Sequence, residues 1–168
     1  GEISFGKRNK RLNSVAELVQ EVSFRHPVLL HFTGKGILNR KIKREENYRH
    51  AILLNAQLED FYFTDYLEDK VAYCSVIRRN VVHEYVALFS KHKLNVIGAS
   101  SGPFLSVPLV SFFDKSTYVV DDIRLTVENN RLSMFEKLED PSGSITIGSD
   151  RIDSDLLGAV SLGANYFS

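Results

Sequence analysis

The chain has 168 residues, of which 43% are hydrophobic and 25% are charged, so it can bury a core and is not expected to be disordered. Its 21 Lys and Arg residues balance 21 Asp and Glu residues, and no overall positive field is available to attract duplex nucleic acid or an anionic membrane. We expect one domain or two small lobes, and no nucleic-acid partner.

The cysteine content and the apolar stretches bear on the compartment. Cys74 is the single cysteine, so no intramolecular disulfide can form, and a reducing, cytoplasmic location is the simpler prediction. The longest apolar stretches, such as 104–113, are shorter than the ~20 residues that span a bilayer, and we expect no membrane insertion. Gly1 stands where an initiator methionine is expected, which suggests a cloning remnant or a piece of a longer protein.

The N-terminal third predicts two helices around a β-hairpin. Ser14 can cap a helix over 14–24, because Glu17 follows at capping-box spacing. Short apolar runs at 27–33 and 37–43 flank Gly34-Lys35-Gly36 and read as the two strands of a hairpin. The residues 45–56 carry apolar side chains at helical spacing and predict the second helix.

The segment 71–99 has the clearest pattern. Residues 71–77 predict a buried strand, 81–91 an amphipathic helix, and 94–99 a second strand. This order is typical of a βαβ unit, in which the two strands would lie parallel in one sheet.

The second half of the chain is rich in predicted strands. These cover 107–113, 117–120, 123–128, 131–137 and 144–148, and a small-residue helix closes the chain over 155–167. Asn129-Asn130 fits a tight hairpin turn, because Asn tolerates positive φ. The loop 100–103 reads as a crossover, which divides the chain into an α/β lobe over 1–100 and a β-rich lobe over 104–168.

A few residues could form a phosphate-binding or a nucleophilic site. The segments 34–36 and 98–103 could be phosphate loops. The first lacks the spacing of a known fingerprint, so a hairpin turn is favoured. In the second, Pro103 removes a backbone donor, so a crossover loop is favoured. Cys74 lies in the most apolar strand and is predicted to be an unreactive core residue. His83 and His92 are expected on the surface of a helix and form no triad.

A two-metal site would need several converging carboxylates. The only plausible set is Glu84, Asp114, Asp121 and Asp122, which falls mostly in turns and on a helix face, so solvated acids are the favoured interpretation. We therefore predict no metal and no cofactor.

Four segments carry a resemblance to known proteins: 26–42 with its Ile-x-Arg-x-Ile-like pattern, 58–62, the strand-helix-strand order of 71–99, and the Gly/Ala-rich helix 156–164. Together they resemble actin-like assembly proteins of the PilM family of type IV pili and the GspL cytoplasmic domains of type II secretion systems. The resemblance implies an α/β, ribonuclease-H-like or actin-like mixed sheet with flanking helices.

The resemblance also implies a function. It points to a non-catalytic assembly or scaffold domain of a secretion or pilus machine, bound to a protein partner or to a second copy. The alternative is an ATP-binding or ATP-hydrolysing enzyme of the same fold. The family's Asp-x-Gly phosphate loops have no match here, since 117–123 offers Asp121 without the glycine, and no nucleotide-binding residue is assigned.

A partner surface is predicted at the end of the first hairpin, on Arg40, Lys41, Lys43 and Arg44. Exposed strand edges accept an added strand, and basic side chains attract an acidic partner. The alternative is that these side chains only protect an edge strand from aggregation.

Overall fold

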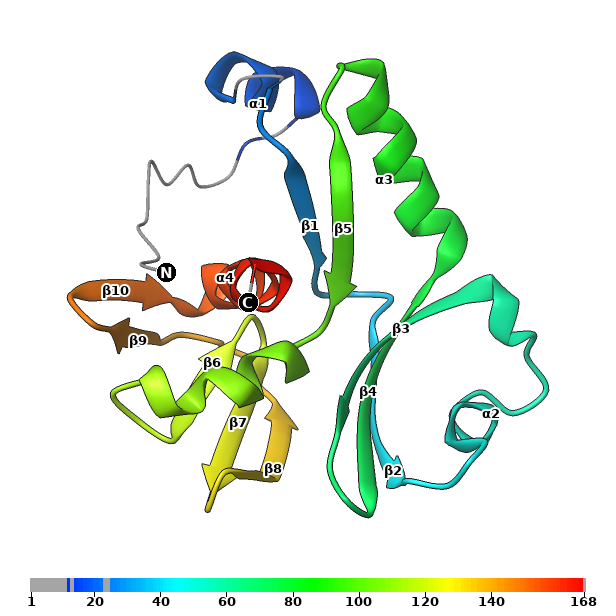
Figure 1. Cartoon of the computed structure of the whole chain (residues 1–168), viewed down its shortest axis with the longest axis vertical. Coiled ribbons are helices and arrows are strands. Elements are labelled where there is room, and N and C mark those ends of the chain that lie inside the picture. The colour runs from blue at the N-terminus through cyan, green and yellow to red at the C-terminus, as the bar shows by residue number, and fades with distance from the viewer. Residues whose placement is uncertain (1–11, 13, 23–24, 168) are drawn as a thin grey trace.

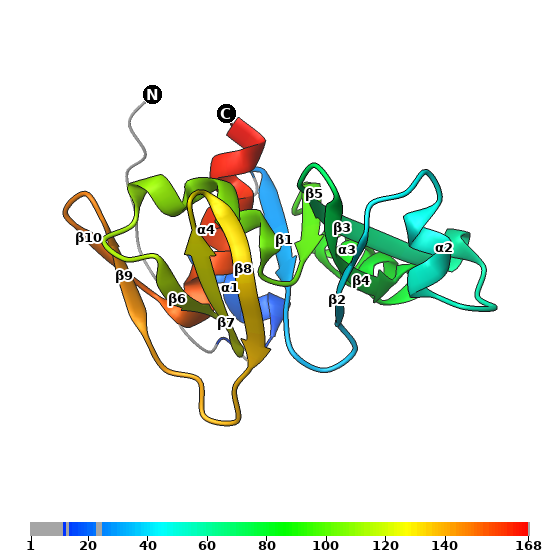
Figure 2. The ribbon, with the colours of Figure 1, turned by 90° about the horizontal axis from the view of Figure 1, so that it is seen from below.

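The structure, a computed structural model, describes residue 12, residues 14–22 and residues 25–167. It is a mixed α/β arrangement of several small sheets and helices (Figure 1). Seen from below, the parallel pair β1 (Val28–Phe32) and β5 (Val96–Ser101) lies between two groups of antiparallel strands (Figure 2). No helix in the described part of the chain is long and apolar enough to cross a bilayer.

The first antiparallel sheet has β4 at its centre. Its strands follow the order β2-β4-β3, with bounds Leu38–Lys43, Val71–Arg78 and Phe61–Leu67. Residues 72–77 of β4 are all buried, because neighbours cover both faces of this strand. Ala72, Cys74 and Val76 face a small cluster that includes residues of α2 (Tyr48–Ile52), while Tyr73 joins the main core. The prediction of a buried strand at 71–77 is confirmed.

The predicted βαβ unit is wrong. The helix α3 (Arg79–Lys91) does follow β4 and lead to β5, but β4 and β5 are not partners in one sheet. The reason is that β2 and β3 occupy the two edges of β4, while β5 pairs in parallel with β1. The helix and both strands form close to the predicted residues, and only the strand with which β5 pairs differs from the prediction.

The predicted hairpin over 27–43 is also wrong. β1 and β2 pair with β5 and β4 respectively, and not with each other. Gly34 and Gly36, with φ of +81° and +92°, turn the chain from one sheet to the other. These φ values favour glycine, so the same two residues that suggest a hairpin turn also suit this connection.

The early helices are shorter than expected. α1 spans Val15–Glu21, and its N-cap is confirmed because the amide of Glu17 donates to Ser14 Oγ at 3.2 Å. Of the predicted helix 45–56 only α2 forms. A 3-10 helix at Leu58–Asp60 then leads into β3, most of which the sequence analysis left without an element.

The second half of the chain forms a three-stranded sheet, a hairpin and a closing helix. The elements are β6 (Thr117–Val120), β7 (Ile123–Glu128), β8 (Arg131–Lys137), β9 (Ser144–Ile147), β10 (Asp150–Asp153) and α4 (Ser154–Phe167). Asn129 and Asn130 have φ of +51° and +59°, which confirms the tight turn. The predicted strand at 107–113 is wrong, because residues Phe104–Phe112 form a 3-10 helix that contains Pro108.

The main core joins the two three-stranded antiparallel sheets, β2-β4-β3 and β6-β7-β8. Tyr73 of β4 packs near Phe104 and Phe135, with ring centroids 5.7 Å and 6.3 Å away. Its buried hydroxyl donates to the carbonyl of Leu132 at 2.6 Å. α4 packs against β1, β5 and β6, so the helix that closes the chain contacts the parallel pair. The division into lobes at residues 100–104 stays a prediction.

Candidate functional site

The strand β2 is an edge of its sheet and carries the predicted partner surface. It pairs with β4 on one side, and it ends the strand order β2-β4-β3. Arg40, Lys41 and Lys43 lie on β2, Arg44 follows it directly, and all four side chains are exposed. The structure therefore places these residues together along one sheet edge, although β2 is not the arm of a hairpin with β1.

The four basic side chains have local contacts. The Lys41 ammonium lies 5.5 Å from the centre of the Tyr73 ring, and Lys43 pairs with Glu45 at 2.7 Å. The Arg40 and Arg44 guanidinium groups donate to the carbonyls of Asn39 at 3.1 Å and Glu68 at 3.0 Å. Exposed contacts of this kind are weak and can be exchanged for those of a partner.

The hydrogen bond between Lys43 and Glu45, with the attraction of their charges, raises the pKa of Lys43 and lowers that of Glu45. Both groups therefore keep their charges at neutral pH. The guanidinium groups of Arg40 and Arg44 lie on the same edge.

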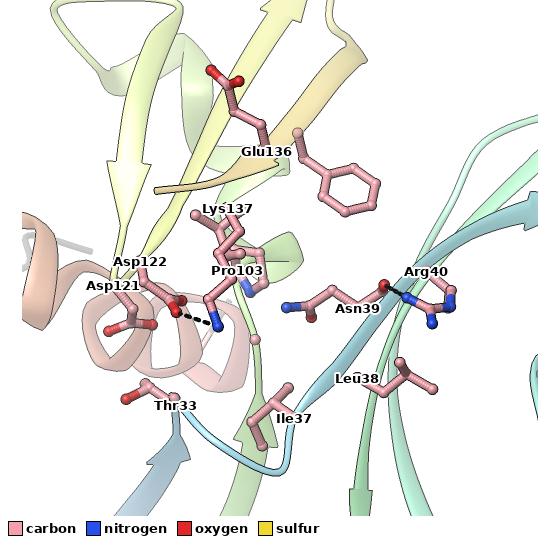
Figure 3. Close-up of a pocket in the computed structure, with 14 residues that line it drawn as sticks. Thr33, Ile37, Leu38, Asn39, Arg40, Pro103, Asp121, Asp122, Glu136 and Lys137 are labelled. Atoms are coloured by element: carbon pink, nitrogen blue, oxygen red, sulfur yellow. Dashed lines mark hydrogen bonds and ion pairs between the residues drawn. The ribbon is translucent and has the colours of Figure 1, made fainter. Parts of the chain in front are cut away.

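A cleft of about 280 Å³ lies between the two antiparallel sheets (Figure 3). It is bordered by the connection from β1 to β2, by the start of β2, and by the turn between β6 and β7. Lys137 of β8 pairs with Asp122 at 3.3 Å inside it. Asp121, which also borders the cleft, is held by His31. Both acids of this turn thus have protein partners.

The side chain of His31 lies in the interior, and no sequence pattern marks it as a site. Its side chain is 4% exposed, and its Nε2 lies 3.3 Å from Asp121 Oδ2 while its Nδ1 lies 2.9 Å from Ser100 Oγ. A Cβ placed on Gly158 of α4 would lie only 2.0 Å from His31 Nε2. The imidazole therefore joins β1, β5, the β6–β7 turn and α4.

The grouping of Ser100, His31 and Asp121 has the residue types of a catalytic triad. However, Ser100, His31 and Asp121 each line a different cavity, and none of these three cavities is lined by more than one of them. A triad needs its nucleophile and base to meet a substrate in one space. The geometry instead suits a polar link within the fold, and no sequence motif pointed to it because the three residues come from distant segments.

The carboxylates that were weighed as a candidate metal site are not brought together. Asp114 accepts the amide of Thr146 at 2.9 Å, a hydrogen bond that lowers the pKa of its carboxyl, and Glu84 is exposed on α3. Within the described residues, no group of three or more His, Cys, Asp or Glu side chains could hold a metal ion.

Cys74 is buried at the centre of the first sheet, as predicted. Burial, with the nearby Asp65 carboxylate, raises the pKa of its thiol from 9.0 to about 12. Asp65 accepts from Tyr48 at 2.7 Å and pairs with Arg49, so its charge is compensated. Because the thiolate is the reactive form, this cysteine is unreactive in the folded chain at neutral pH.

A comparison with protein-family models finds no match, and a comparison with curated proteins finds none. Among solved structures, the chain is similar to the cytoplasmic domain of EpsL, an inner membrane component of the type II secretion system of Vibrio cholerae. The identity is 12% and the TM-score 0.47, over 73% of this chain and 53% of the other. A similarity at this level establishes neither a family nor an activity.

Proposed function

We propose that this chain is a non-catalytic assembly domain of the actin-like, ribonuclease-H-like class, and that it acts in the cytoplasm by binding an acidic segment of another protein along β2. The observation that carries the proposal is the position of β2. It is an edge strand, and it and the next residue carry four exposed basic side chains in five positions. A sheet edge offers unpaired backbone donors and acceptors, and the basic side chains select an acidic partner.

The type of machine follows from the sequence resemblance. The residues 26–42 and 71–99 resemble the PilM and GspL proteins, which implies a secretion or pilus apparatus. The ATP-dependent alternative is less well supported by the cleft, because Asp121 and Asp122 are already paired with His31 and Lys137.

Charge reversal on β2 tests the proposal. The variant K41E/K43E places negative charge on the exposed edge. It should lose a partner that the wild-type chain captures from its source cell. The wild-type complex should be weaker at physiological salt than at low salt. The matched control is K91E/K115E, which reverses two exposed lysines away from β2 and should keep the partner. The melting temperature of each variant is measured and should equal that of the wild type, which shows that both variants are folded.

A complex that survives K41E/K43E at both salt concentrations would show that β2 is not the contact surface. It would also favour the alternative that these basic residues only protect the edge from aggregation. Loss of the partner in the control variant as well would assign the effect to total charge and not to β2.

A further inference from the structure

A groove of about 400 Å³ lies where the parallel pair meets the first antiparallel sheet. Residues of β5 line one side, residues 62–64 of β3 line the other, and Val82 and Val86 of α3 contribute to its wall. Across the described residues, β5 pairs with β1 alone and β3 with β4 alone. The groove therefore runs beside two sheet edges that have no backbone ladder between them.

The two strands are held together at one end of the groove only by side-chain contacts. The amide of Ser101, the last residue of β5, donates to Thr64 Oγ1 at 3.0 Å, and the two hydroxyl oxygens lie 3.5 Å apart. No backbone hydrogen bond links β5 to β3 in the described part of the chain. Beside the rest of β5, the backbone edge is open to a further extended chain.

The lining of the groove has both an apolar part and a positive end. Ile77, Val82 and Val86 contribute apolar surface, and Ala99 of β5 is exposed within it. His83 is the one lining residue with a basic side chain among those the structure describes. It lies 2.9 Å from the hydroxyl of Tyr62, so the basic side chain sits at the β3 side of the groove.

Arg79 adds a fixed positive charge at that side. Its guanidinium lies 4.6 Å from the centre of the Tyr62 ring, and its Nε is buried without a hydrogen-bond partner. Arg79 does not itself line the groove, but its guanidinium lies beside Tyr62, which does, and its positive charge attracts a carboxylate bound there. No Asp or Glu lies among the described residues that line the groove.

We propose that this groove binds an extended segment of another protein. The segment adds to the free edge of β5 through backbone hydrogen bonds, places alternate apolar side chains against Val82 and Val86, and presents a carboxylate to Arg79. The site is separate from β2 and does not rest on the function proposed above. The unpaired strand edges select an extended backbone, and the charge of Arg79 beside Tyr62 selects the acidic residue.

Binding is tested with synthetic peptides of alternating Val and Thr that carry one Glu at the first or the last position. Each is titrated into ¹⁵N-labelled protein, with Lys-for-Glu peptides as the charge control. We expect saturable shifts of the amides of residues 62–64 and 96–101. We also expect about fivefold tighter binding of one Glu peptide than of its Lys counterpart, as for an ion pair at a partly open site.

Variants locate the site. A99R fills the groove and should weaken binding about tenfold or more, whereas A51R, at an exposed alanine of α2, should leave it unchanged. R79Q should remove the preference for Glu over Lys while the backbone-driven binding remains. Melting temperatures confirm that each variant is folded, and K41E/K43E should bind the peptides like the wild type, which separates this site from β2.

Three results would overturn the proposal. The first is the absence of saturable binding by any peptide up to about 1 mM, a concentration at which even weak strand addition is measurable. The second is equal weakening by A99R and A51R. The third is a dimer, concentration-dependent and broken by A99R, whose interface covers the same amides, because that result assigns the groove to a second copy of this chain.

Discussion

The hydroxyl of Tyr73 on β4 donates to the carbonyl of Leu132 on β8, 59 residues further along the chain, at 2.6 Å. The amide of Leu132 in turn donates to Glu68 Oε1 at 2.8 Å, so both backbone groups of this one residue are bound by side chains of the other sheet. The tips of two hairpins are thereby fixed to each other, and the two antiparallel sheets share one core.

Removal of the Tyr73 hydroxyl tests this link. The variant Y73F keeps the ring among Phe104 and Phe135 but leaves the buried carbonyl of Leu132 without its donor, which should lower the free energy of unfolding by about 1–3 kcal/mol. Urea denaturation measures the change. Y62F, which removes an exposed tyrosine hydroxyl, serves as the control and should have a much smaller effect. Equal stability of Y73F and the wild type would contradict the importance of this contact.

Gly158 is required by the position of His31. A Cβ there would lie 2.0 Å from Nε2, so G158A should destabilise the fold by about 1–3 kcal/mol through overpacking. In the H31A background the obstruction is gone, and the same change should become neutral or stabilising because Ala is the better helix former. Urea denaturation of the four chains completes the double-mutant cycle, and an equal penalty in both backgrounds would refute the contact.

The raised pKa of Cys74 predicts both its reactivity and a pH dependence. Iodoacetamide at pH 8 should leave the native thiol unmodified and react in urea. Since the folded-state pKa is about 12 and the ordinary value 9.0, the unfolded chain releases this proton first as the pH rises. The contribution of Cys74 to stability is complete below pH 9.0 and is lost progressively toward pH 12.

Unfolding in urea from pH 8 to pH 11 measures this loss against C74A. The wild type should lose stability more steeply than C74A, because the variant lacks the titrating thiol while other alkaline titrations, including that of Tyr118, are common to both. Parallel pH profiles would show that the thiol is solvated in the folded state.

The ATP-dependent alternative is tested by a thermal shift with Mg-ATP. A nucleotide that binds the folded chain raises its melting temperature by mass action. We expect no shift, because Asp121 and Asp122 in the cleft are paired with His31 and Lys137. A reproducible rise of several degrees that D121N abolishes would favour the enzyme over the assembly domain.

The local sequence pattern predicted the helices, strands and turns better than it predicted which strands pair with each other. The apolar run at β4, the helical spacing of α3 and the Asn129-Asn130 turn each depend on neighbouring residues, and these predictions are confirmed. The pairing of β1 with β5 joins residues about 70 positions apart, and the local sequence of either strand does not specify its pairing partner. Two glycines after β1 suit a hairpin turn and a passage between sheets equally well, so the hairpin was the wrong interpretation.

The 3-10 helix at Phe104–Phe112 was missed for a related reason. Its apolar side chains are nearly continuous, as in a buried strand. Phe104 and Val107 are buried in the main core, and the segment contacts β3, β4 and α4. Periodicity cannot separate these two cases in a short run. For the candidate sites, sequence alone could indicate the basic residues of β2, whereas the His31 cluster and the groove beside β5 depend on long-range packing.

The parallel pair has a consequence for how the chain folds. The chain leaves β1 at Thr33 and returns at Val96, so the whole first antiparallel sheet and α3 form one excursion between two paired strands. Closing so long an excursion is entropically expensive unless its contents are already compact. The hairpin of β3 and β4 is local and can form early. Its assembly with β2 and α3 makes the segment compact, which brings β5 closer to β1. The β1–β5 pairing is therefore expected late in folding, after the segment it encloses.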